Sequence, residues 1–203
     1  MENYIVLNGQ KIKLTESQVE EIKNSFNINT LQLKDVPVGE TFKVGELEFI
    51  VLEHWAEATA VILKEFWKTC DFDDSSNDYK ESSIRKQLNA DFYKQLSSVV
   101  GKDNIEEHTV DLTSDDGRKD YSFCTDNISL LTCDDYRKYV TILDKYKIHQ
   151  WWWLATPYST QNNGYNFSVR GVGYLGALNC YDCDHDIGVR PFCILKSNIF
   201  VSK

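Results

Sequence analysis

The stretch from Trp151 to Ser202, WWWLATPYSTQNNGYNFSVRGVGYLGALNCYDCDHDIGVRPFCILKSNIFVS, decides the fold. It holds three of the five tryptophans, three of the six cysteines and five of the ten glycines of the 203-residue chain. The three consecutive tryptophans predict a buried strand with aromatic volume on both faces. This strand ends at Thr156 and Pro157, because proline cannot donate to a sheet ladder. Glycines then separate short strand-like runs such as YLGAL, and GVRPFCILKSNIFV predicts two further hydrophobic strands. The pattern is typical of a compact, turn-rich β-region.

The residues upstream predict hairpins and two helices packed on them. TFKV and LEFIVLEHW flank Gly45-Glu46 as a hairpin, and ATAVILKEF adds a third strand. A helix capped by Ser82 or Ser83 extends to about Val100, and a second one runs from Asp134 to about Tyr146. The first of these helices has apolar residues at a spacing of four along one face, which are Ile84, Leu88, Phe92 and Leu96. We therefore expect an α+β fold with a mostly antiparallel sheet, two or three packed helices, and Trp151–Leu154 beside the terminal strand.

The N-terminal residues predict a small separate unit. YIVLNGQKIKL alternates around Asn8-Gly9, a strong hairpin signal, and Thr15 with Gln18 forms a plausible capping box for a short helix. A hairpin and one helix are too small to bury a core of their own. We expect residues 1–28 to form a hairpin–helix module that docks on the rest or on a second copy of the chain. Residues 31–203 form the main α+β domain, and FNINT is the linker.

Four motifs, in the same order along the chain, resemble a known family. They are WWWLATP, GVRPFCIL, ESSIRKQLNADFY and SLLTCDDYRKY. Together they resemble a domain-of-unknown-function family (number 6273) of gut Firmicutes and their phages, over about Leu31 to Val201. Ala155 departs from the pattern, because the family usually has arginine there. The terminal motif also resembles, more weakly, the last strand of C-type-lectin-like folds. The resemblance implies a fold and a phage or mobile-element origin, but no chemistry.

Composition limits the classes of partner. There are 22 Lys and Arg against 31 Asp and Glu, a net charge of -9, so direct binding to a nucleic-acid backbone is not expected. The opening residues do not resemble a signal peptide, and no apolar run approaches the length of a membrane-spanning helix. We expect a cytoplasmic protein with reduced cysteines and no membrane contact.

No motif in the sequence is specific for a metal site or a catalytic site. Cys180, Cys183 and His185 could supply three zinc ligands, with His149 as a fourth, but a second well-spaced ligand pair is missing. The acidic DFDDSSND segment lacks the glycine and distal glutamate of a calcium loop. Nucleophilic pairs such as Cys183–His185 or Cys70–His54 can be drawn, but none of the common hydrolase or nucleotide-binding motifs is present. The expectation is a protein that is not an enzyme and has no cofactor and no metal.

The clearest functional signal is a Tyr, Asn, Ser and Gly-rich surface between the two signature strands. Such residues build binding loops, since aromatic side chains give contact area at low entropic cost. Turn-rich β-structure also needs asparagine and glycine, which is the plainer explanation. The predicted binding residues are Tyr158, Asn162, Asn163, Tyr165, Asn166, Arg170, Tyr181, Asp182, Asp184 and His185. They belong to two predicted loops, residues 158–166 and 179–186.

Two functional hypotheses follow. The first is a non-catalytic protein that binds a host macromolecule, most simply a host protein such as a component of bacterial defence. The second is recognition of a small ligand or glycan, by analogy with lectin-like folds. A zinc-dependent or cysteine enzyme is a third and weaker alternative. Arg190 is a separate case: inside an apolar strand it should meet a carboxylate or several carbonyls as a structural clamp, with ligand binding as the alternative.

Overall fold

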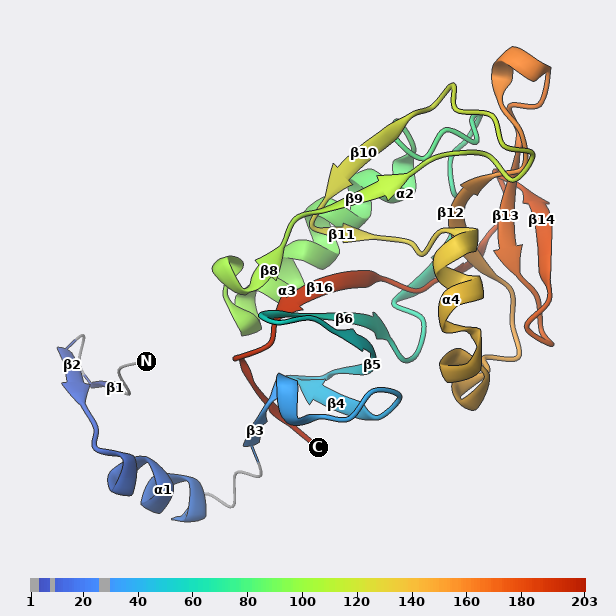
Figure 1. Ribbon diagram of the computed structural model, residues 1–203. Coiled ribbons are helices and arrows are strands. Elements are labelled where there is room, and N and C mark those ends of the chain that lie inside the picture. Colours follow the sequence, from blue (N-terminus) through green and yellow to red (C-terminus); the bar gives the residue numbers. More distant parts are fainter. Residues whose placement is uncertain (1–3, 8–9, 26–29) are drawn as a thin grey trace.

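The computed structural model describes residues 4–7, 10–25 and 30–203. Strands β1 (Tyr4–Leu7) and β2 (Gln10–Lys13) pair with each other, and α1 (Glu16–Ser25) follows them. The backbone and hydroxyl of Thr15 both donate to Gln18 Oε1, while Gln18 N donates to Thr15 Oγ1, which confirms the predicted capping box. The predicted Asn8-Gly9 turn and the predicted linker up to Asn29 lie outside the described residues. In Figure 1 this hairpin–helix unit lies beside the main body, which begins at β3.

The main body contains two β-sheets. The larger has the strand order β11-β16-β6-β5-β4-β17-β3, with β8 also paired to β16. Its strands are β3 (Thr30–Gln32), β4 (Thr41–Val44), β5 (Leu47–His54), β6 (Ala58–Leu63), β8 (Ile105–Glu106), β11 (Ile128–Ser129), β16 (Phe192–Lys196) and β17 (Phe200–Ser202). The smaller sheet has the order β14-β13-β12-β15-β7. Its strands are β7 (Lys68–Cys70), β12 (Trp152–Pro157), β13 (Ser168–Val172), β14 (Leu178–Asp182) and β15 (Ile187–Val189).

A two-stranded ribbon and several helices complete the body. The ribbon pairs β9 (His108–Asp111) with β10 (Phe123–Asp126). The helical segments are α2 (Ser83–Gln87), the π-helical η2 (Leu88–Phe92), α3 (Tyr93–Val100), α4 (Cys133–Leu143), and the 3-10 turns η1 (Leu33–Asp35), η3 (Lys102–Asn104), η4 (Asp144–Tyr146) and η5 (Gln161–Asn163). Among the described strands, β12 and β15 are the one parallel pair and every other pair is antiparallel. The predicted α+β class is therefore confirmed.

The larger sheet is covered on both faces, because alternate residues of a strand point to opposite sides. On β5, Phe49 and Val51 join one apolar core, whereas Ile50 and Leu52 join another. Helices α2 and α3 contribute to the first core and α4 contributes to the second. Figure 1 shows α3 behind the sheet and α4 in front of it.

The continuous helix α2–η2–α3 carries the predicted apolar face. Ile84, Leu88, Phe92 and Leu96 are all fully buried. A strict spacing of four drifts around an ideal α-helix, which has 3.6 residues per turn. The wider π-helical segment between Leu88 and Phe92 offsets this drift and keeps the four side chains in one core. None of the helices in the described part of the chain is long and apolar enough to cross a membrane.

The tryptophan strand packs on both faces as predicted. Trp153 lies in the first core and donates from Nε1 to the Cys70 carbonyl at 3.0 Å, while Trp152 lies in the second core. The predicted neighbour is partly correct, since β12 pairs with β15, the first part of the predicted GVRPFCIL strand, but not with β16, its second part. GVRPFCIL is two strands in different sheets. Arg190 and Pro191 form the crossover between them, where the backbone leaves one ladder and enters the other.

The crossover runs beside a second one, from β6 to β7. Leu63 N donates to the Pro191 carbonyl at 2.9 Å, and Arg190 Nε donates to the Leu63 carbonyl at 2.8 Å. Gly188 is required just before this point, because a Cβ there would lie 2.3 Å from the ring of Phe66. The predicted YLGAL strand is wrong, because a turn occupies its first residues. Gly176 adopts a φ of +85° and closes a turn, so the strand begins only at Leu178.

Candidate functional site

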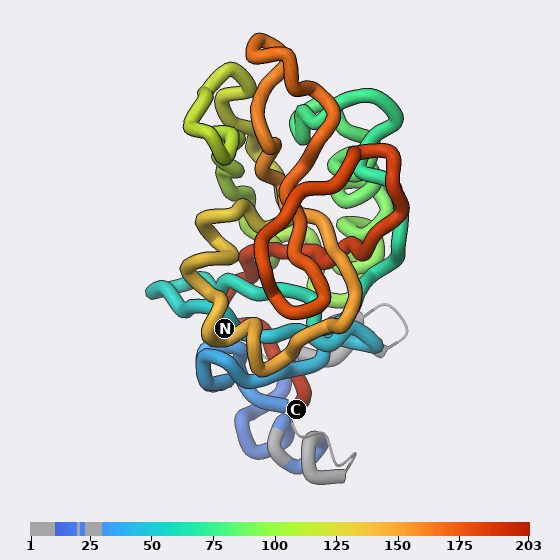
Figure 2. Tube along the Cα trace, turned by 90° about the vertical axis from the view of Figure 1, so that its right-hand side faces the viewer, coloured from blue at the N-terminus to red at the C-terminus, as the bar shows by residue number. Residues whose placement is uncertain are grey.

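The predicted loop at residues 158–166 projects from the end of β12 and returns into β13. Figure 2 shows it between the segments around residues 71–82 and 112–121. The second predicted loop, 179–186, is only partly a loop, since β14 occupies its first half and pairs with β13. The described contacts divide the predicted binding residues into two groups, one on each side of β13.

The first group is built on Arg170, which projects from β13. Its guanidinium lies over the Tyr158 ring, with Cζ 4.9 Å from the ring centroid, and Nη2 forms an ion pair with Asp115. Tyr158 in turn contacts Tyr165 edge-on, at 5.7 Å between ring centroids. The tyrosines remain 37% and 53% exposed. Arg170 is thus already paired, and the exposed rings of Tyr158 and Tyr165 are what a partner would meet.

The second group surrounds Trp151, which precedes β12. The Tyr181 ring lies 5.2 Å from Trp151 and 4.7 Å from the His185 ring, and Tyr174 contacts Trp151 at 6.1 Å. His185 Nδ1 lies 3.0 Å from Asp184, and both side chains are about half exposed. Asp182 is exposed and accepts a hydrogen bond from the Ser168 hydroxyl at 3.2 Å. Trp151 and Tyr174 were not predicted as binding residues, although both are aromatic residues within the motifs WWW and GVGYL of the same stretch.

The three predicted asparagines have mainly structural partners. Asn163 Nδ2 donates to Ser159 Oγ at 3.0 Å, Asn162 hydrogen-bonds Asp120, and the Asn166 carbonyl accepts from the Asn77 backbone at 2.9 Å. These contacts fit the turn chemistry that the sequence left as the plainer explanation. These contacts fix the loop, so the three asparagines are less available to a partner than the sequence predicted.

Asn77 is the residue that holds the loop, and sequence reasoning missed it. It is fully buried, and the two hydrogens on its Nδ2 are shared among the carbonyls of Ser159, Tyr165 and Ser168, each 3.0–3.1 Å from Nδ2. Its Oδ1 accepts from the Tyr121 hydroxyl at 2.8 Å. A buried amide with all these bonds made is a rigid hub, because breaking any of them leaves an unpaired polar group. Asn77 lies in the acidic segment that appeared to be a plain solvated loop, so no sequence signal distinguished it.

A polar cavity of about 440 Å³ adjoins the first group, and we call it the Asp115 cavity. It lies where the 111–117 segment meets the start of α4. Arg137 crosses its wall and pairs with both Asp115, at 3.0 Å, and Asp134, at 2.7 Å. Arg170 and Arg137 hold the pKa of Asp115 below its usual value against the opposing effect of burial. Asp115 is therefore an ionised link between the cavity and the tyrosine group.

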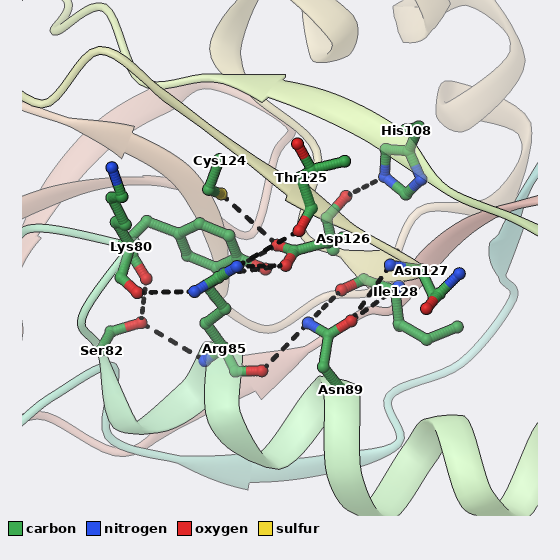
Figure 3. Close-up of polar contacts among 12 residues, drawn as sticks. Lys80, Ser82, Arg85, Asn89, His108, Cys124, Thr125, Asp126, Asn127 and Ile128 are labelled. Carbon is green, nitrogen blue, oxygen red and sulfur yellow. Dashed lines mark hydrogen bonds and ion pairs between the residues drawn. The ribbon is translucent and has the colours of Figure 1, made fainter.

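A second polar cluster, shown in Figure 3, lies on the other side of the ribbon. Ser82 Oγ accepts from Arg85 N at 3.3 Å as the predicted N-cap of α2. Arg85 Nη2 lies 2.7 Å from Asp126 Oδ1, and Nε lies 3.0 Å from Oδ2. Asn89 Oδ1 accepts from the backbone of Asn127 and Ile128, and its Nδ2 donates to the Ile128 carbonyl at 2.9 Å. These residues attach the helix to the β10–β11 corner, so their role is structural.

Cys70, Cys124 and Cys183 do not have the environment of catalytic nucleophiles. Burial raises the pKa of the Cys124 and Cys183 thiols to about 12 and that of Cys70 to about 11. A thiolate is the reactive form, so these thiols are protonated near neutral pH. Cys183 lies within the first core. The proposed Cys70–His54 pair is not formed, because His54 Nε2 contacts the Val36 carbonyl at 2.8 Å and Nδ1 contacts Thr59 Oγ1 at 2.9 Å.

The predicted zinc alternative gains no support from the geometry. Within the described residues, no three His, Cys, Asp or Glu side chains converge as metal ligands. Arg190 is only partly as predicted: it is 1% exposed and meets one carbonyl, and its Nη2 has no hydrogen-bond partner in the described part of the chain. Its Cζ instead lies 5.4 Å from the ring centroid of Trp152. The expected carboxylate is not among its described partners.

The comparisons with known proteins give one match. Residues 58–197, which are 140 of the 203 residues, match the family described as "Domain of unknown function (DUF6273)". Neither the curated proteins nor the solved structures gave a match, so the weaker likeness to C-type lectins stays a prediction.

Proposed function

The chain belongs to the DUF6273 family of domains of unknown function, and from this membership and the geometry of its loops we propose that it is a non-catalytic binding protein that engages another protein. One observation carries the proposal. Tyr158 and Tyr165 are exposed on a loop, and the buried side chain of Asn77 hydrogen-bonds the backbone carbonyls of this loop. A loop that is already ordered loses little entropy on binding, and tyrosine anchors dominate many protein interfaces.

Charge indicates the kind of partner. The chain has a net charge of -9, and the aromatic surface is bordered by Asp115, Asp116 and Asp120. These carboxylates accept hydrogen bonds from Arg170, Ser159 and Thr160, so they are fixed in position. An acidic rim favours a partner with a basic face and speeds association at low salt. We propose a host protein of this kind, such as a component of bacterial defence.

A double variant, Tyr158→Ala with Tyr165→Ala, tests the proposal. Loss of the two anchors should abolish capture of the partner from a host-cell lysate, since hot-spot residues typically contribute about 2 kcal/mol or more each. The melting temperature should stay unchanged, because both rings are at the surface. Phe200→Ala removes an aromatic side chain about as exposed as Tyr165, 51% exposed on β17, and is the matched control. Capture that survives in the double variant would place the interface elsewhere.

The group around Trp151 favours a second candidate, recognition of a small ligand or glycan. Three aromatic rings, Trp151, Tyr174 and Tyr181, lie in contact beside the exposed polar side chain of Asp182. Sugar rings stack on such faces while their hydroxyls bond to nearby carboxylates. Binding of glycans that is lost in Trp151→Ala, with protein capture unchanged, would favour this candidate over the first.

A further inference from the structure

Three neighbouring cavities form one groove, two of them lined by residues of β9 and the third by Glu106 and Glu107 just before it. A cavity of about 730 Å³ shares Trp55 and Ile194 with one of about 160 Å³, which in turn shares Thr109 and Asp135 with the Asp115 cavity. The groove therefore extends from the β5–β6 turn to the start of α4. This length and continuity suit an extended chain better than a compact small molecule.

Strand β9 presents one unpaired edge within the described sheets. It pairs with β10 alone, and the ladder continues at Leu112, whose N–H donates to the Ser122 carbonyl at 3.0 Å. In an antiparallel ladder, bonded and non-bonded pairs alternate. His108 and Val110 are therefore in bonded pairs with β10, whereas the backbone groups of Thr109 and Asp111 face the outer edge. Thr109 and Asp111 both line the groove, so this edge is open to it.

The groove carries an excess of negative charge. Seven carboxylates and four cationic side chains line its three cavities. Three of the cations are already paired: Arg137 with Asp134 and Asp115, Lys138 with Glu53 outside the groove, and Lys196 with Glu106 at 3.9 Å. Glu57, Glu107 and Asp111 have no ion pair with any described residue. A basic chain would find uncompensated carboxylates at both ends of the groove.

The middle of the groove offers a partly apolar pocket, since Trp55, Phe192 and Ile194 line it together with polar side chains such as those of Asp135 and Lys138. Trp55 is 43% exposed there, and Phe192 packs edge-on against the His108 ring at 5.2 Å. A cavity of about 160 Å³ between them has room for one apolar or aromatic side chain. Peptides that add to a sheet edge gain affinity from backbone bonds and selectivity from such alternate side-chain pockets.

We propose that the free edge of β9 accepts an extended basic segment of a partner protein as an additional strand, with one apolar side chain of that segment in the Trp55–Phe192 pocket. The inference deepens the proposed function by naming the partner's chemistry: lysine or arginine at alternate positions around a central apolar residue. The groove ends at Asp115, so such a segment would continue toward Tyr158 on the neighbouring surface.

The test uses a short fluorescent peptide of alternating lysine and threonine with a central leucine. Glu107→Lys with Asp111→Lys should weaken its binding at least tenfold, and the affinity of the unaltered protein should fall with salt. Asp74→Lys with Asp103→Lys changes the charge equally at exposed positions outside the groove and should have a much smaller effect. The same peptide with alternate N-methylated amides cannot form ladder bonds and should not bind.

Thr109→Pro separates strand addition from simple charge attraction. Its N–H faces the outer edge and is not needed by the β9–β10 ladder, and proline is tolerated on edges. The variant should keep its melting temperature and lose peptide binding. Equal binding by the charge-reversed variant, by the N-methylated peptide or by Thr109→Pro would overturn the inference, as would no binding to the unaltered protein. If the Tyr158 and Tyr165 experiment succeeds while this one fails, only the groove inference falls.

Discussion

Two arginines from the family motifs, Arg85 and Arg190, occupy opposite electrostatic environments. Arg85 projects from α2 to the corner of β10, where it forms a two-pronged ion pair with Asp126 and donates to two carbonyls. Arg190 lies in the crossover between the sheets, donates to one carbonyl, and faces the Trp152 ring. Asp126 raises the pKa of Arg85 above its usual value, whereas burial lowers that of Arg190 to about 10.

The difference teaches that a signature arginine is not automatically a site residue. The charge of Arg85 is compensated by a carboxylate, and the ion pair connects α2 to β10 of the ribbon. The charge of Arg190 contacts only an indole ring and one carbonyl, which compensate less well than a carboxylate for the loss of hydration. Arg85 is occupied by Asp126 and two carbonyls, and Arg190 is 1% exposed, so neither offers a free guanidinium to a ligand. The binding surface that we propose lies instead in the loop where the rings of Tyr158 and Tyr165 are exposed.

The largest effect is expected from breaking the Arg85 pair. Asp126→Ala should lower the free energy of unfolding by about 2–3 kcal/mol, somewhat below the range for a fully buried pair because the Arg85 side chain is 26% exposed. Urea denaturation of the purified protein measures this. Asp134→Ala removes the partner of an exposed pair, 92% exposed on the carboxylate, and should cost no more than about 0.5 kcal/mol. Equal losses in the two variants would show that burial does not distinguish the pairs.

Much of the fold could be predicted from the sequence because its signals are local. The Ser82 cap, the four-residue apolar repeat of the helix and the Gly45-Glu46 hairpin each depend on neighbouring residues, and all are confirmed. The crossover at Arg190 was missed, because nothing local shows that one apolar run serves two sheets. It depends on Leu63, far away in sequence.

The candidate site was predictable only in part. The Tyr158 and Tyr165 pair follows from loop composition, and the structure brings the two rings together. Asp115, Arg137 and Asn77 come from other segments, and their sequence contexts look like ordinary acidic loops and a helix surface. Pairings across distant segments leave no periodic signal in a single sequence. For the same reason, the sequence could not show that the partners of Arg190 are the Leu63 carbonyl and the Trp152 ring, and a carboxylate was expected instead.

Arg190→Met sharpens the comparison, with a smaller expected effect. An ion pair at Arg190 would make its loss cost about 3 kcal/mol, but replacing a poorly compensated buried charge by an apolar side chain is often close to neutral. We expect a change within about 1 kcal/mol, because the lost bond to Leu63 is offset by relief from burying the charge and by a sulfur contact with Trp152. Arg190→Lys keeps the charge without the planar group and should be less stable than Arg190→Met in urea. The reverse order would mean that charge at this position stabilises the crossover.

The smallest effect is expected from His108, which is subject both to burial, as Arg190 is, and to nearby carboxylates, as Arg85 is. Burial lowers its pKa below the ordinary value near 6.5, while Asp126, the Glu106 carbonyl, Asp135 and Glu107 oppose the shift. A lowered pKa in the folded state means that the unfolded chain takes up the proton first as the pH falls. The contribution of His108 to stability is therefore complete above about pH 6.5 and is lost progressively below it.

His108→Gln can keep a hydrogen bond to Ser129, now 2.8 Å from His108 Nε2, but cannot titrate. Unfolding free energies of the two proteins should thus converge on acidification from pH 7.5 to 5.5, or cross if the variant starts close to the original. A gap that is constant with pH would mean that folding leaves the pKa of His108 unchanged. A gap that widens in favour of His108 at low pH would show that the surrounding carboxylates hold the ring in its charged form, as Asp126 holds Arg85.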